Sequence, residues 1–571
     1  MDDAAAETKV EWREWGDEAF AVADRSNKPV LLSLTAPWCE DCTEMDRTTY
    51  AEPRVAANVN DGFVPVRVNV DRHPRVRDRY NMGGFPSTVF TTPDGTVITG
   101  ATFLGVDGFR EILDAVRRTW DGKGTDAGSV PRSVRDSEPP GGELSARVEE
   151  HMVEQLLASY DEEFGGWGTD VKFPLPRTIE FALVRARDQA TRSLEAVQSR
   201  LADTYDGGFY RFSRNRNWSD PQREKLVDEN AALVRAFARG YRYTGEDAYR
   251  ETAERTVEYL TTDLWTGEAF AASQGGDDAY YRREATGRED ADPPSVDETV
   301  FAGHNGVAID GLLTHAAYTD DERARRYAER ARDHVVEHLV DDGEVVHYRD
   351  GDEVGEAGLL SSQARVLAGL TTAGEVLGEM GPARAVADYA LDELQDESGA
   401  FRDADPEGAG LLDRPLHPLD TNASVADALV DCWLLTDEER YRTAAREALA
   451  AFAGAIDRMG VEVAHYASAV ARLRDPQVVA VGAPAVERGL GVPALLVVEL
   501  QPVEYLLGGF VAIIGDGFVR LAQRSHQGER GIQILRLQDA HAALDDGAPE
   551  AVGQAVADQG ADDHPGDLEE H

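Results

Sequence analysis

The sequence predicts a multidomain protein in which an N-terminal α/β domain is followed by an all-α domain of helical hairpins. Residues 1–122 alternate short β-rich runs with helical segments, whereas residues 146–482 carry apolar residues with a helical period of roughly 3.6 residues. A length of 571 residues also exceeds what one hydrophobic core normally holds. We therefore expect domains at 1–122 and 146–482, a linker at 123–145 and a further C-terminal segment at 483–571.

The elements of the N-terminal domain follow the order strand, helix, strand, hairpin, helix. Buried strands are expected at 29–35 and 63–70, with a helix at 39–50 between them. A Pro-Asp-Gly turn signal at 93–95 separates strands expected at 87–91 and 96–99, and a helix at 106–120 closes the domain. This order predicts a small mixed sheet with helices on both faces.

The second domain is predicted to consist of hairpins of amphipathic helices. Helices are expected at 226–243, 248–264, 305–318, 322–339, 363–377, 383–394, 423–435 and 439–456. Turns containing glycine follow alternate helices, at 164–168, 206–210, 267–270, 342–345 and 399–401. Hairpins in series either stack as an open solenoid or close into a ring, and a ring would gather these turns around one end of a central cavity.

The C-terminal segment differs from the rest in composition. A strand is expected at 478–482, and from 483 to 540 six acidic residues stand against five arginines, so the acidic excess of the chain is lost. Residues from 545 onward are acidic and rich in Ala and Gly, which favours disorder. Two interpretations stay open for 483–571: an appendage or shifted reading frame under different selection, and a small β-rich cap that buries its apolar face on the helical domain. Neither places a catalytic residue there.

The charge balance excludes several classes of function. The chain has 58 Lys and Arg against 106 Asp and Glu, a net charge of −48. Such a surface repels phosphate backbones and anionic lipids, so we expect no nucleic-acid partner and no membrane. An acidic excess spread along the chain predicts adaptation to molar salt, where a Debye length of about 3 Å screens the repulsion, rather than an acidic tail or partner-binding patch. Lysine is confined to Lys9, Lys28, Lys123, Lys172 and Lys225.

Cysteine usage and hydropathy predict a cytoplasmic protein. Three cysteines cannot form a disulfide framework. The first ten residues have neither the basic nor the apolar region of a secretory signal, and the apolar run at 505–515 is too short to span a bilayer. In the cytoplasm a Cys pair is more often catalytic than structural. Cys432, on an apolar helix face, is expected in the core.

Cys39 and Cys42 form a CxxC motif where the first buried strand gives way to a helix. At a helix N-terminus the free N–H groups and the helix dipole stabilise the Cys39 thiolate, and Cys42 can resolve a mixed disulfide. Trp38 would shield one side, while Glu40 and Asp41 oppose the thiolate by like charge. A zinc half-site and an inert buried pair are the alternatives. Because the sequence has no second ligand pair with this spacing, we expect no metal and no cofactor.

Several motifs together resemble a known family. They are the aromatic segment at 11–20, residues 28–30, the CxxC, residues 51–56 and 63–68, residues 71–74 and the run 83–95. Over about 8–122 they are similar to the thioredoxin-like domain of the two-domain family of spermatogenesis-associated thioredoxin-domain proteins; over 146–482 the similarity is looser. The resemblance implies a thioredoxin-like fold with cis Pro86 beside the dithiol, followed by a six-hairpin, glycosidase-like α/α toroid. The family usually has His and Trp where Glu40 and Asp41 stand.

The same resemblance implies a cleft in the toroid. A sugar-like ligand would need aromatic platforms and carboxylates at a fixed gap. The candidates are Trp167, Phe209, Tyr210 and Trp218 as platforms, and Glu224, Asp228, Asp297 and Asp420 as carboxylates. With 106 acidic residues in the chain, a solvated or capping carboxylate is the alternative for each. Gln222, Arg223 and His304 stand where the family usually has His, Phe and Trp.

Three functions follow from these observations. The first is a cytosolic thiol–disulfide oxidoreductase that uses Cys39 and Cys42 and whose toroid binds a client or a sugar-like ligand. Its partners would be protein thiol or disulfide clients or a thioredoxin reductase-type donor. The second is a carbohydrate-active enzyme, a hydrolase or epimerase/isomerase, with a regulatory thioredoxin domain. The third is a non-enzymatic binding protein.

Overall fold

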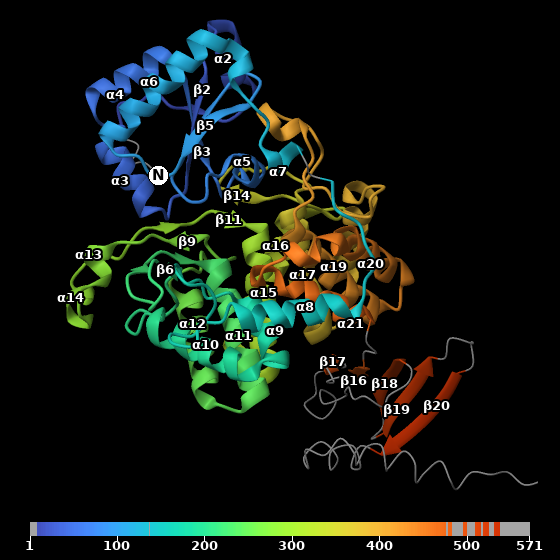
Figure 1. Ribbon diagram of the computed structural model, residues 1–571. Helices are drawn as coiled ribbons and strands as arrows, with labels where there is room; N and C mark the ends of the chain where they lie inside the picture. The colour runs from blue at the N-terminus through green and yellow to red at the C-terminus, as the bar shows by residue number, and fades with distance from the viewer. Residues whose placement is uncertain are drawn as a thin grey trace, which may run out of the picture.

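The computed structural model describes residues 8–135 and 138–474, and strands within 478–536. An α/β domain stands on one end of a domain of paired helices (Figure 1). Within these described residues no helix is long and apolar enough to cross a membrane.

Five strands form the sheet of the N-terminal domain, in the order β1-β3-β2-β4-β5. The central strand β2 runs parallel to β3 and antiparallel to β4, which forms a hairpin with β5. The strands are β1 (Arg13–Glu14), β2 (Val30–Thr35), β3 (Val64–Asn69), β4 (Ser87–Thr91) and β5 (Val97–Ala101). The helices are α2 (Asp17–Ser26), α3 (Glu40–Thr48), α4 (Pro53–Gly62), α5 (Pro74–Tyr80) and α6 (Val106–Lys123).

Both faces of this sheet are buried, because alternate residues of a strand point to opposite sides. On β2, Leu31 joins a cluster with Phe63 and Phe90, whereas Leu32 joins a second cluster with Val66. The predicted mixed sheet with helices on both faces is therefore confirmed, and its fold is thioredoxin-like.

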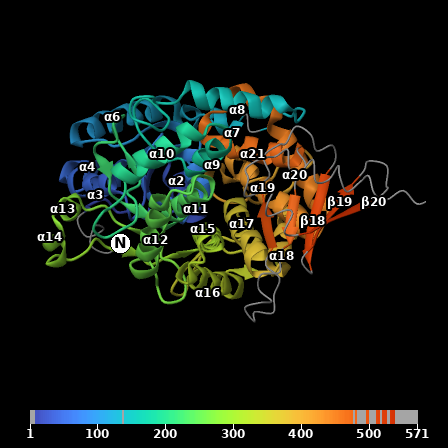
Figure 2. The same cartoon turned by 90° about the horizontal axis from the view of Figure 1, so that it is seen from below.

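The helical domain is a closed ring of six hairpins. Each inner helix contacts the next, and the last contacts the first, which decides between a solenoid and a ring (Figure 2). The inner helices are α9 (Pro176–Arg185), α11 (Val227–Thr244), α15 (Ala302–Thr319), α17 (Leu360–Leu377), α19 (Leu419–Thr436) and α21 (Ala464–Arg474). The outer helices are α8 (Ala146–Ala158), α10 (Arg187–Arg200), α12 (Asp247–Thr262), α16 (Glu322–His338), α18 (Gly381–Tyr389) and α20 (Glu439–Phe452). The predicted α/α toroid is confirmed.

The connections at the two ends of the ring differ in length. An inner helix passes to the next outer helix through a few residues, such as 245–246 or 320–321, whereas an outer helix reaches its inner partner through a long loop, such as 201–226 or 263–301. The loop 263–301 contains two short helices, α13 (Asp278–Tyr281) and α14 (Ala285–Glu289). The long loops gather at the end of the ring that faces the thioredoxin-like domain (Figure 1).

An asparagine clamp repeats at this end of the ring. In three inner helices the fourth residue is an asparagine whose side-chain amide bonds both the N–H and the carbonyl of a phenylalanine in the preceding turn. The pairs are Asn230 with Phe209, Asn305 with Phe270 and Asn422 with Phe401. Each clamp satisfies buried backbone groups and fixes the long loop to the helix that follows it.

Two of the five lysines are buried in the same turns. The side chain of Lys172 lies 2.9 Å from Asp161, and that of Lys225 lies 2.9 Å from Asp203. Both lysines are fully buried, and each ammonium also donates to carbonyls of a glycine-rich turn. A buried charge must be paired and hydrogen-bonded, so these lysines are structural.

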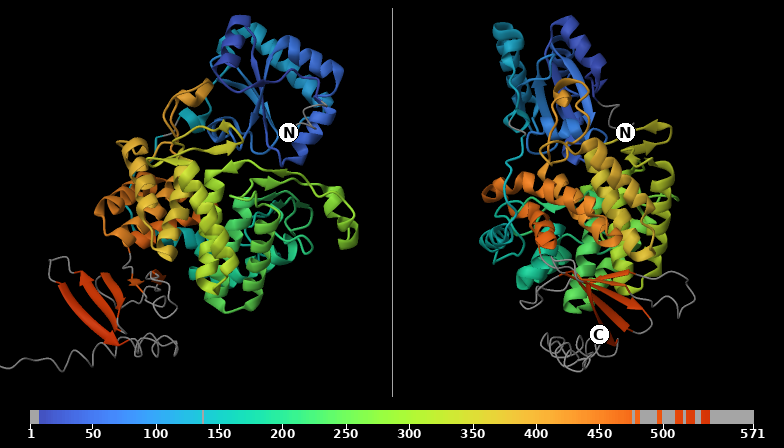
Figure 3. Two further views of the ribbon diagram at one scale, coloured as in Figure 1. Left: turned by 180° about the vertical axis from the view of Figure 1, so that it is seen from behind. Right: turned by 90° about the vertical axis from the view of Figure 1, so that its right-hand side faces the viewer.

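The two domains share a continuous apolar interface. A loop of the ring, residues 403–416, lies beside the thioredoxin-like domain (Figure 3). Its residues Leu411 and Leu412 belong to the same buried cluster as Phe20 and Tyr80. The hydroxyl of Tyr80 accepts a hydrogen bond from the N–H of Leu411 at 3.0 Å.

Two arginines of α5 reinforce this interface. Arg79 is fully buried and pairs with Asp403 at 2.7 Å. Arg75 and Arg79 also donate hydrogen bonds to backbone carbonyls of residues 405–414. The helical domain thus holds the thioredoxin-like domain in one orientation.

The segment expected as a linker packs against both domains. Ser129 exchanges backbone hydrogen bonds with Val97 of β5, and the N–H of Gly142 donates to the carbonyl of Ala450 in α20. A short helix, α7 (Arg132–Arg135), lies between these contacts. The segment is therefore a strap between the domains, although its composition gives no helical or strand period.

A second five-stranded sheet follows the ring. Its strands are β16 (Val478–Val481), β17 (Leu495–Val498), β18 (Gly509–Gly515), β19 (Phe518–Arg524) and β20 (Arg530–Arg536), in the order β17-β16-β18-β19-β20. Strand β16 confirms the strand expected at 478–482. The tail from 545, for which we expected disorder, lies outside the described residues.

Candidate functional site

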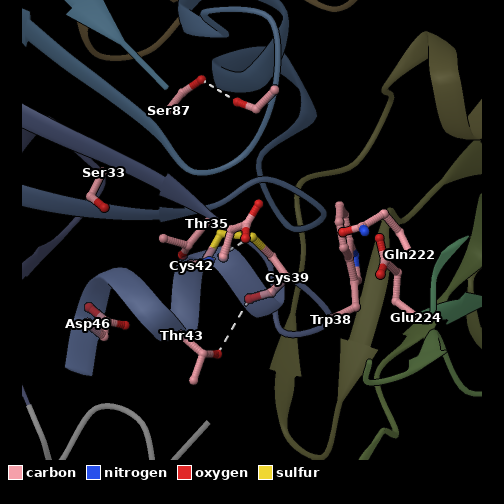
Figure 4. The surroundings of a disulfide bond; sticks show 12 residues. Ser33, Thr35, Trp38, Cys39, Cys42, Thr43, Asp46, Ser87, Gln222 and Glu224 are labelled. Carbon is pink, nitrogen blue, oxygen red and sulfur yellow. Dashed lines mark hydrogen bonds between the residues drawn. A yellow bond between two sulfur atoms is a disulfide. The ribbon is translucent and has the colours of Figure 1, made fainter. Parts of the chain in front are cut away.

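A disulfide joins Cys39 to Cys42 at the junction of β2 and α3 (Figure 4). Cys39 is the N-cap of α3, and its sulfur accepts the N–H of Cys42 at 3.1 Å. The exposed fractions of Cys39 and Cys42 are 5% and 4%. In the reduced state the same N–H would stabilise a thiolate at Cys39, because the first N–H groups of a helix have no partner within the helix.

The two residues between the cysteines face the helical domain. Burial and the nearby carboxylate of Asp278 raise the pKa of Glu40. Asp41 pairs with Arg214 at 2.8 Å, and Arg214 also donates to the side chain of Gln222 at 2.6 Å. The charge of Asp41 is therefore partly neutralised from the ring, which reduces its repulsion of a thiolate.

Trp38 precedes Cys39 in the chain, and its side chain is held from both domains. Its indole N–H donates to Asp71 at 2.7 Å, and its ring meets that of Phe85 edge to face at 6.0 Å. Burial raises the pKa of Asp71. From the ring, the guanidinium of Arg211 lies 4.3 Å from the centre of the Trp38 indole. The Phe85–Pro86 peptide bond is cis, as predicted.

Arg211 links Trp38 to two carboxylates of the ring. It lies 3.4 Å from Glu224 and 3.4 Å from Glu229. Burial raises the pKa of Glu224, and Arg211 opposes this shift. Of the predicted cleft residues, Glu224 is thus the one placed directly beside the dithiol region (Figure 4).

Asp228 lies next to Glu229 in the first turn of α11. It accepts a hydrogen bond from Arg365 at 3.0 Å, and Nε2 of His304 is 3.8 Å away. Burial opposes the ionisation of Asp228, but His304 and Arg365 outweigh it and lower its pKa to about 2. Asp228 is therefore an ionised carboxylate at any ordinary pH.

Glu229 has the opposite behaviour. Burial raises the pKa of Glu229 to about 7, and the neighbouring charge of Asp228 adds to the shift. Its Oε2 has no hydrogen-bond partner among the described residues, although 31% of the side chain is accessible. Two adjacent carboxyl groups whose pKa values are pushed apart are the arrangement used for acid–base chemistry.

Three of the predicted aromatic platforms lie inside the wall of the ring. Trp167, Phe209 and Trp218 are only 3%, 1% and 3% exposed. The indole of Trp167 donates to the carbonyl of Leu156, and the ring of Phe209 stacks on that of Phe237. The glycine turns fold these rings back between inner and outer helices, so none offers a free face to a sugar, which corrects the expectation.

The remaining cleft candidates lie on three segments of the ring. Tyr210 packs against Tyr281, edge to face at 5.3 Å, and precedes Arg211, whose N–H donates to the carbonyl of Glu224 at 3.1 Å. Asp297 caps its own loop by accepting from the N–H and the hydroxyl of Thr299, and it lies in a three-stranded sheet with Leu226. Asp420, on α19, is largely exposed and lies 3.4 Å from Nε2 of His465. Tyr210 and Asp297 thus lie on segments next to Glu224 and Asp228.

Sequence reasoning missed a cavity of about 310 Å³ inside the ring. Its charged side chains pair across the helices: Arg235 forms two hydrogen bonds with Glu180 and also pairs with Asp310, and Arg472 pairs with Asp427 and Asp431. None of the predicted cleft residues lines it. The sequence signal that could have indicated this cavity is a charged residue on the otherwise apolar face of an inner helix.

One further carboxyl group in the cavity is perturbed. Burial and the nearby charge of Asp431 raise the pKa of Glu375 to about 8. Among the described residues, no group of three or more His, Cys, Asp or Glu side chains is arranged to hold a metal ion.

Comparison with known proteins divides the chain in the same way. Residues 3–136 match a family model described as "Thioredox_DsbH: Protein of unknown function, DUF255". Spermatogenesis-associated protein 20 of Homo sapiens is 28% identical over 294 residues, which cover 45% of this chain and 37% of that protein. The thiol:disulfide interchange protein DsbD of Yersinia pestis (strain Pestoides F) is 27% identical over 101 residues, 17% of each protein.

A solved structure resembles part of the chain. The cellobiose 2-epimerase of Spirochaeta thermophila DSM 6192 has a TM-score of 0.44 and 16% identity, covering 53% of this chain and 82% of the epimerase.

The chain thus combines a thioredoxin-like domain, related to those of DsbH and DsbD, with an α/α toroid. The sequence relatives confirm the resemblance to the family that includes spermatogenesis-associated protein 20, and the match spans less than half of that relative's length.

Proposed function

We propose that this protein is a thiol–disulfide oxidoreductase that uses Cys39 and Cys42 at the end of the toroid. The observation that supports the proposal is the disulfide at the N-terminus of α3, with the Cys42 N–H directed at the Cys39 sulfur. A related protein, DsbD, is named a thiol:disulfide interchange protein. A toroid that contacts the dithiol region through Arg211 and Arg214 would govern which substrates reach the dithiol.

The exchange follows from the positions of the two sulfurs. In the reduced protein the Cys39 thiolate attacks a substrate disulfide, one substrate sulfur leaves with a proton as a thiol, and a mixed disulfide forms at Cys39. Cys42 then loses its proton and attacks the Cys39 sulfur. The second substrate sulfur leaves as a thiol with the proton from Cys42. The substrate disulfide is thereby reduced by two electrons, and the protein dithiol is oxidised to the Cys39–Cys42 disulfide. A protein client and a thioredoxin reductase-type donor are the partners that the sequence led us to expect.

Mass mapping across a glutathione potential series tests this proposal. We expect Cys39 and Cys42 to convert reversibly between dithiol and disulfide at one midpoint, while Cys432, which is fully buried, stays reduced. Limiting alkylation of the reduced protein should label Cys39 before Cys42. Preferential labelling of Cys42, or a pair that no oxidant closes, would refute the proposal.

A second candidate function is acid–base chemistry on a sugar-like ligand at the end of the toroid. Asp228, with a pKa of about 2, and Glu229, with a pKa of about 7, are the observation that favours it. A glycan-binding and turnover screen with the wild type, Glu229→Gln and Asp228→Asn tests it. Turnover that is unchanged in both variants would remove these residues from the reaction.

The cellular setting belongs to the same proposal. The acidic excess spread over the chain suits a cytoplasm that contains molar salt. Measurement of the protein's stability at low salt, described in the Discussion, tests this point.

A further inference from the structure

The dithiol is nearly buried, and the helical domain contacts the residues beside it. The exposed fractions of Cys39, Cys42 and Trp38 are 5%, 4% and 6%. Arg211 lies over the indole of Trp38 and Arg214 pairs with Asp41, so side chains of the ring contact both sides of the CxxC segment. Figure 4 shows Gln222 and Glu224 of the ring beside Trp38. In a thiol–disulfide exchange the attacking and attacked sulfurs must approach to roughly 3–3.5 Å. A disulfide inside a folded protein would have to bring its surrounding backbone into this space.

The helical domain is also anchored at points away from the dithiol. Arg79 of α5 is fully buried and pairs with Asp403 of the ring, and Arg72 pairs with Glu353 at 2.6 Å. His347 of the ring donates from Nε2 to the backbone carbonyl of Asp71 at 2.6 Å.

His347 makes this last contact as a neutral side chain. Burial lowers the pKa of His347 to about 3, so its imidazole is uncharged, and the imidazole Nδ1 accepts a hydrogen bond from the Ser362 hydroxyl at 2.8 Å. The residue it bonds, Asp71, also holds Trp38 in place. Separating the domains would break these bonds together with the apolar contacts of the 403–416 loop.

Part of the surface on the ring side of Trp38 is open to solvent. Glu229 and His304 have 31% and 19% of their side-chain surface accessible. Oε2 of Glu229 and Nδ1 of His304 have no hydrogen-bond partner among the described residues, but both atoms are themselves buried. A reagent of low molecular weight would approach from this partly open side, whereas a folded protein would meet the docked ring.

We infer that Cys39 and Cys42 exchange with low-molecular-weight thiols and disulfides, and that the docked toroid excludes folded protein substrates. The inference rests on the proposed oxidoreductase function and names its substrate class. Two small thiols reduce the Cys39–Cys42 disulfide: the first attacks Cys39, forms a mixed disulfide there and releases Cys42 as a thiol, and the second attacks the sulfur of the bound small thiol and releases Cys39. The products are one small disulfide and the protein dithiol, and the two thiol protons end on the two cysteines.

Alkylation with reagents of two sizes tests access without requiring turnover. The reduced protein, kept folded in molar salt, is treated with iodoacetamide or with a maleimide that carries a long polyethylene glycol chain. We expect iodoacetamide to label Cys39 and the large reagent to label neither cysteine until the protein is denatured. Cys432 is the internal control for unfolding, because it is fully buried. Labelling of Cys39 by the large reagent at a rate similar to that of iodoacetamide would overturn the inference.

Single-turnover reduction compares the substrates directly. The pre-reduced protein is mixed with hydroxyethyl disulfide or with insulin, and the loss of protein thiol is followed. We expect rapid reaction with the small disulfide and at least about tenfold slower reaction with insulin. Equal rates would overturn the inference alone, whereas no reaction with either substrate would overturn the proposed oxidoreductase function as well.

A variant with weakened contacts beside the dithiol supplies the matched comparison. The double variant Arg211→Ala/Arg214→Ala removes the two contacts beside the dithiol and should raise the insulin rate about tenfold or more. The control Arg192→Ala/Arg330→Ala removes a similar ion pair with Glu162 at 2.7 Å and a similar contact with Trp265 at 4.8 Å, both far from Cys39 in the sequence. An equal gain in both double variants would show general loosening and contradict the specific role of these contacts. Circular dichroism confirms that each variant is folded.

Discussion

The dithiol region and the central cavity of the toroid both gather charged or reactive side chains, but they draw these side chains from the chain in different ways. At the dithiol, Trp38, Cys39 and Cys42 come from one short segment that runs from the end of β2 into the first turn of α3. In the cavity, charged residues come from different inner helices, as with Arg235 of α11 and Asp310 of α15.

The difference extends to how polar groups are satisfied. In the cavity, Arg235 and Arg472 each bond two carboxylates, an arrangement that holds the inner helices together. Beside the dithiol, Glu229 keeps an unpartnered oxygen and a raised pKa. A group with a perturbed pKa and an unsatisfied polar atom is a better candidate for chemistry than a group locked in ion pairs.

The largest effect should come from the cysteines. Cys39→Ser should abolish thiol–disulfide exchange, a loss of about a hundredfold or more, because serine is no nucleophile toward disulfides at neutral pH. Cys42→Ser should stop after the mixed disulfide, which mass spectrometry would detect. Glu375→Gln in the cavity and Cys432→Ser are the controls and should retain exchange. Exchange that survives in Cys39→Ser would show that the chemistry lies outside the dithiol region.

Low salt should unfold the protein, with loss of the whole free energy of unfolding of about 5–15 kcal/mol. At 0.01 M salt the Debye length grows to about 30 Å, so a net charge of −48 repels itself across both domains. Circular dichroism during dialysis measures the transition. Restored salt should refold the protein, whereas sorbitol, which screens no charge, should not. Native spectra in millimolar salt would contradict the adaptation to molar salt.

Breaking the buried ion pair between the domains should be the next largest effect. Arg79→Met leaves the nearly buried carboxylate of Asp403 without its closest partner and should lower the free energy of unfolding by about 3–5 kcal/mol. The matched control is Arg147→Met, whose pair with Asp457 at 3.0 Å is 69% and 71% exposed. We expect a change within about 1 kcal/mol there. Denaturant titration in molar salt measures both, and similar losses would argue against a docked interface.

Glu229 should produce a small, pH-dependent effect. Its pKa rises from 4.5 when unfolded to about 7 when folded, so the folded state binds more protons between these values. The stability that this provides is complete below pH 4.5 and is lost as the pH rises through 7.

The variant Glu229→Gln isolates that effect. Above pH 7 it should be more stable than the wild type by about 1 kcal/mol, after allowance for solvent screening at a partly accessible side chain. Thermal melts at pH 5 and pH 8 measure the difference. Glu163→Gln, at an exposed carboxyl group, should show none. A wild-type profile identical to that of Glu229→Gln would refute the raised pKa.

Much of the fold followed from local patterns. The strands around 30–35, 64–69 and 87–91 and the hairpin at 93–95 were predicted from β-rich runs and turn residues, and the helices of the ring from their apolar spacing. The closure of six hairpins into a ring came from the family resemblance, since helical hairpins alone allow a solenoid as well.

The candidate site was only partly predictable. The CxxC motif carries its chemistry within four residues, so the sequence was enough to place it before a helix. Trp167, Phe209 and Trp218 were expected as ligand platforms because a sugar site needs aromatic faces and the family resemblance implies a cleft in the toroid. Whether an aromatic side chain faces a cavity or is buried between helices depends on which helices pack around it, and here all three belong to the hydrophobic core of the helical domain.

The sequence by itself determined the CxxC pair, the acidic surface and the period of each helix, because each of these depends on residues that are neighbours in the chain or on composition. Only the tertiary structure decided that the toroid contacts the residues beside the dithiol, that Arg211 meets Trp38 and that burial raises the pKa of Glu229 to about 7. Those features depend on burial and on contacts between residues about 170 positions apart, such as Asp41 and Arg214. No local pattern encodes such contacts, because packing free energy is shared over the whole interface rather than assigned to any one segment.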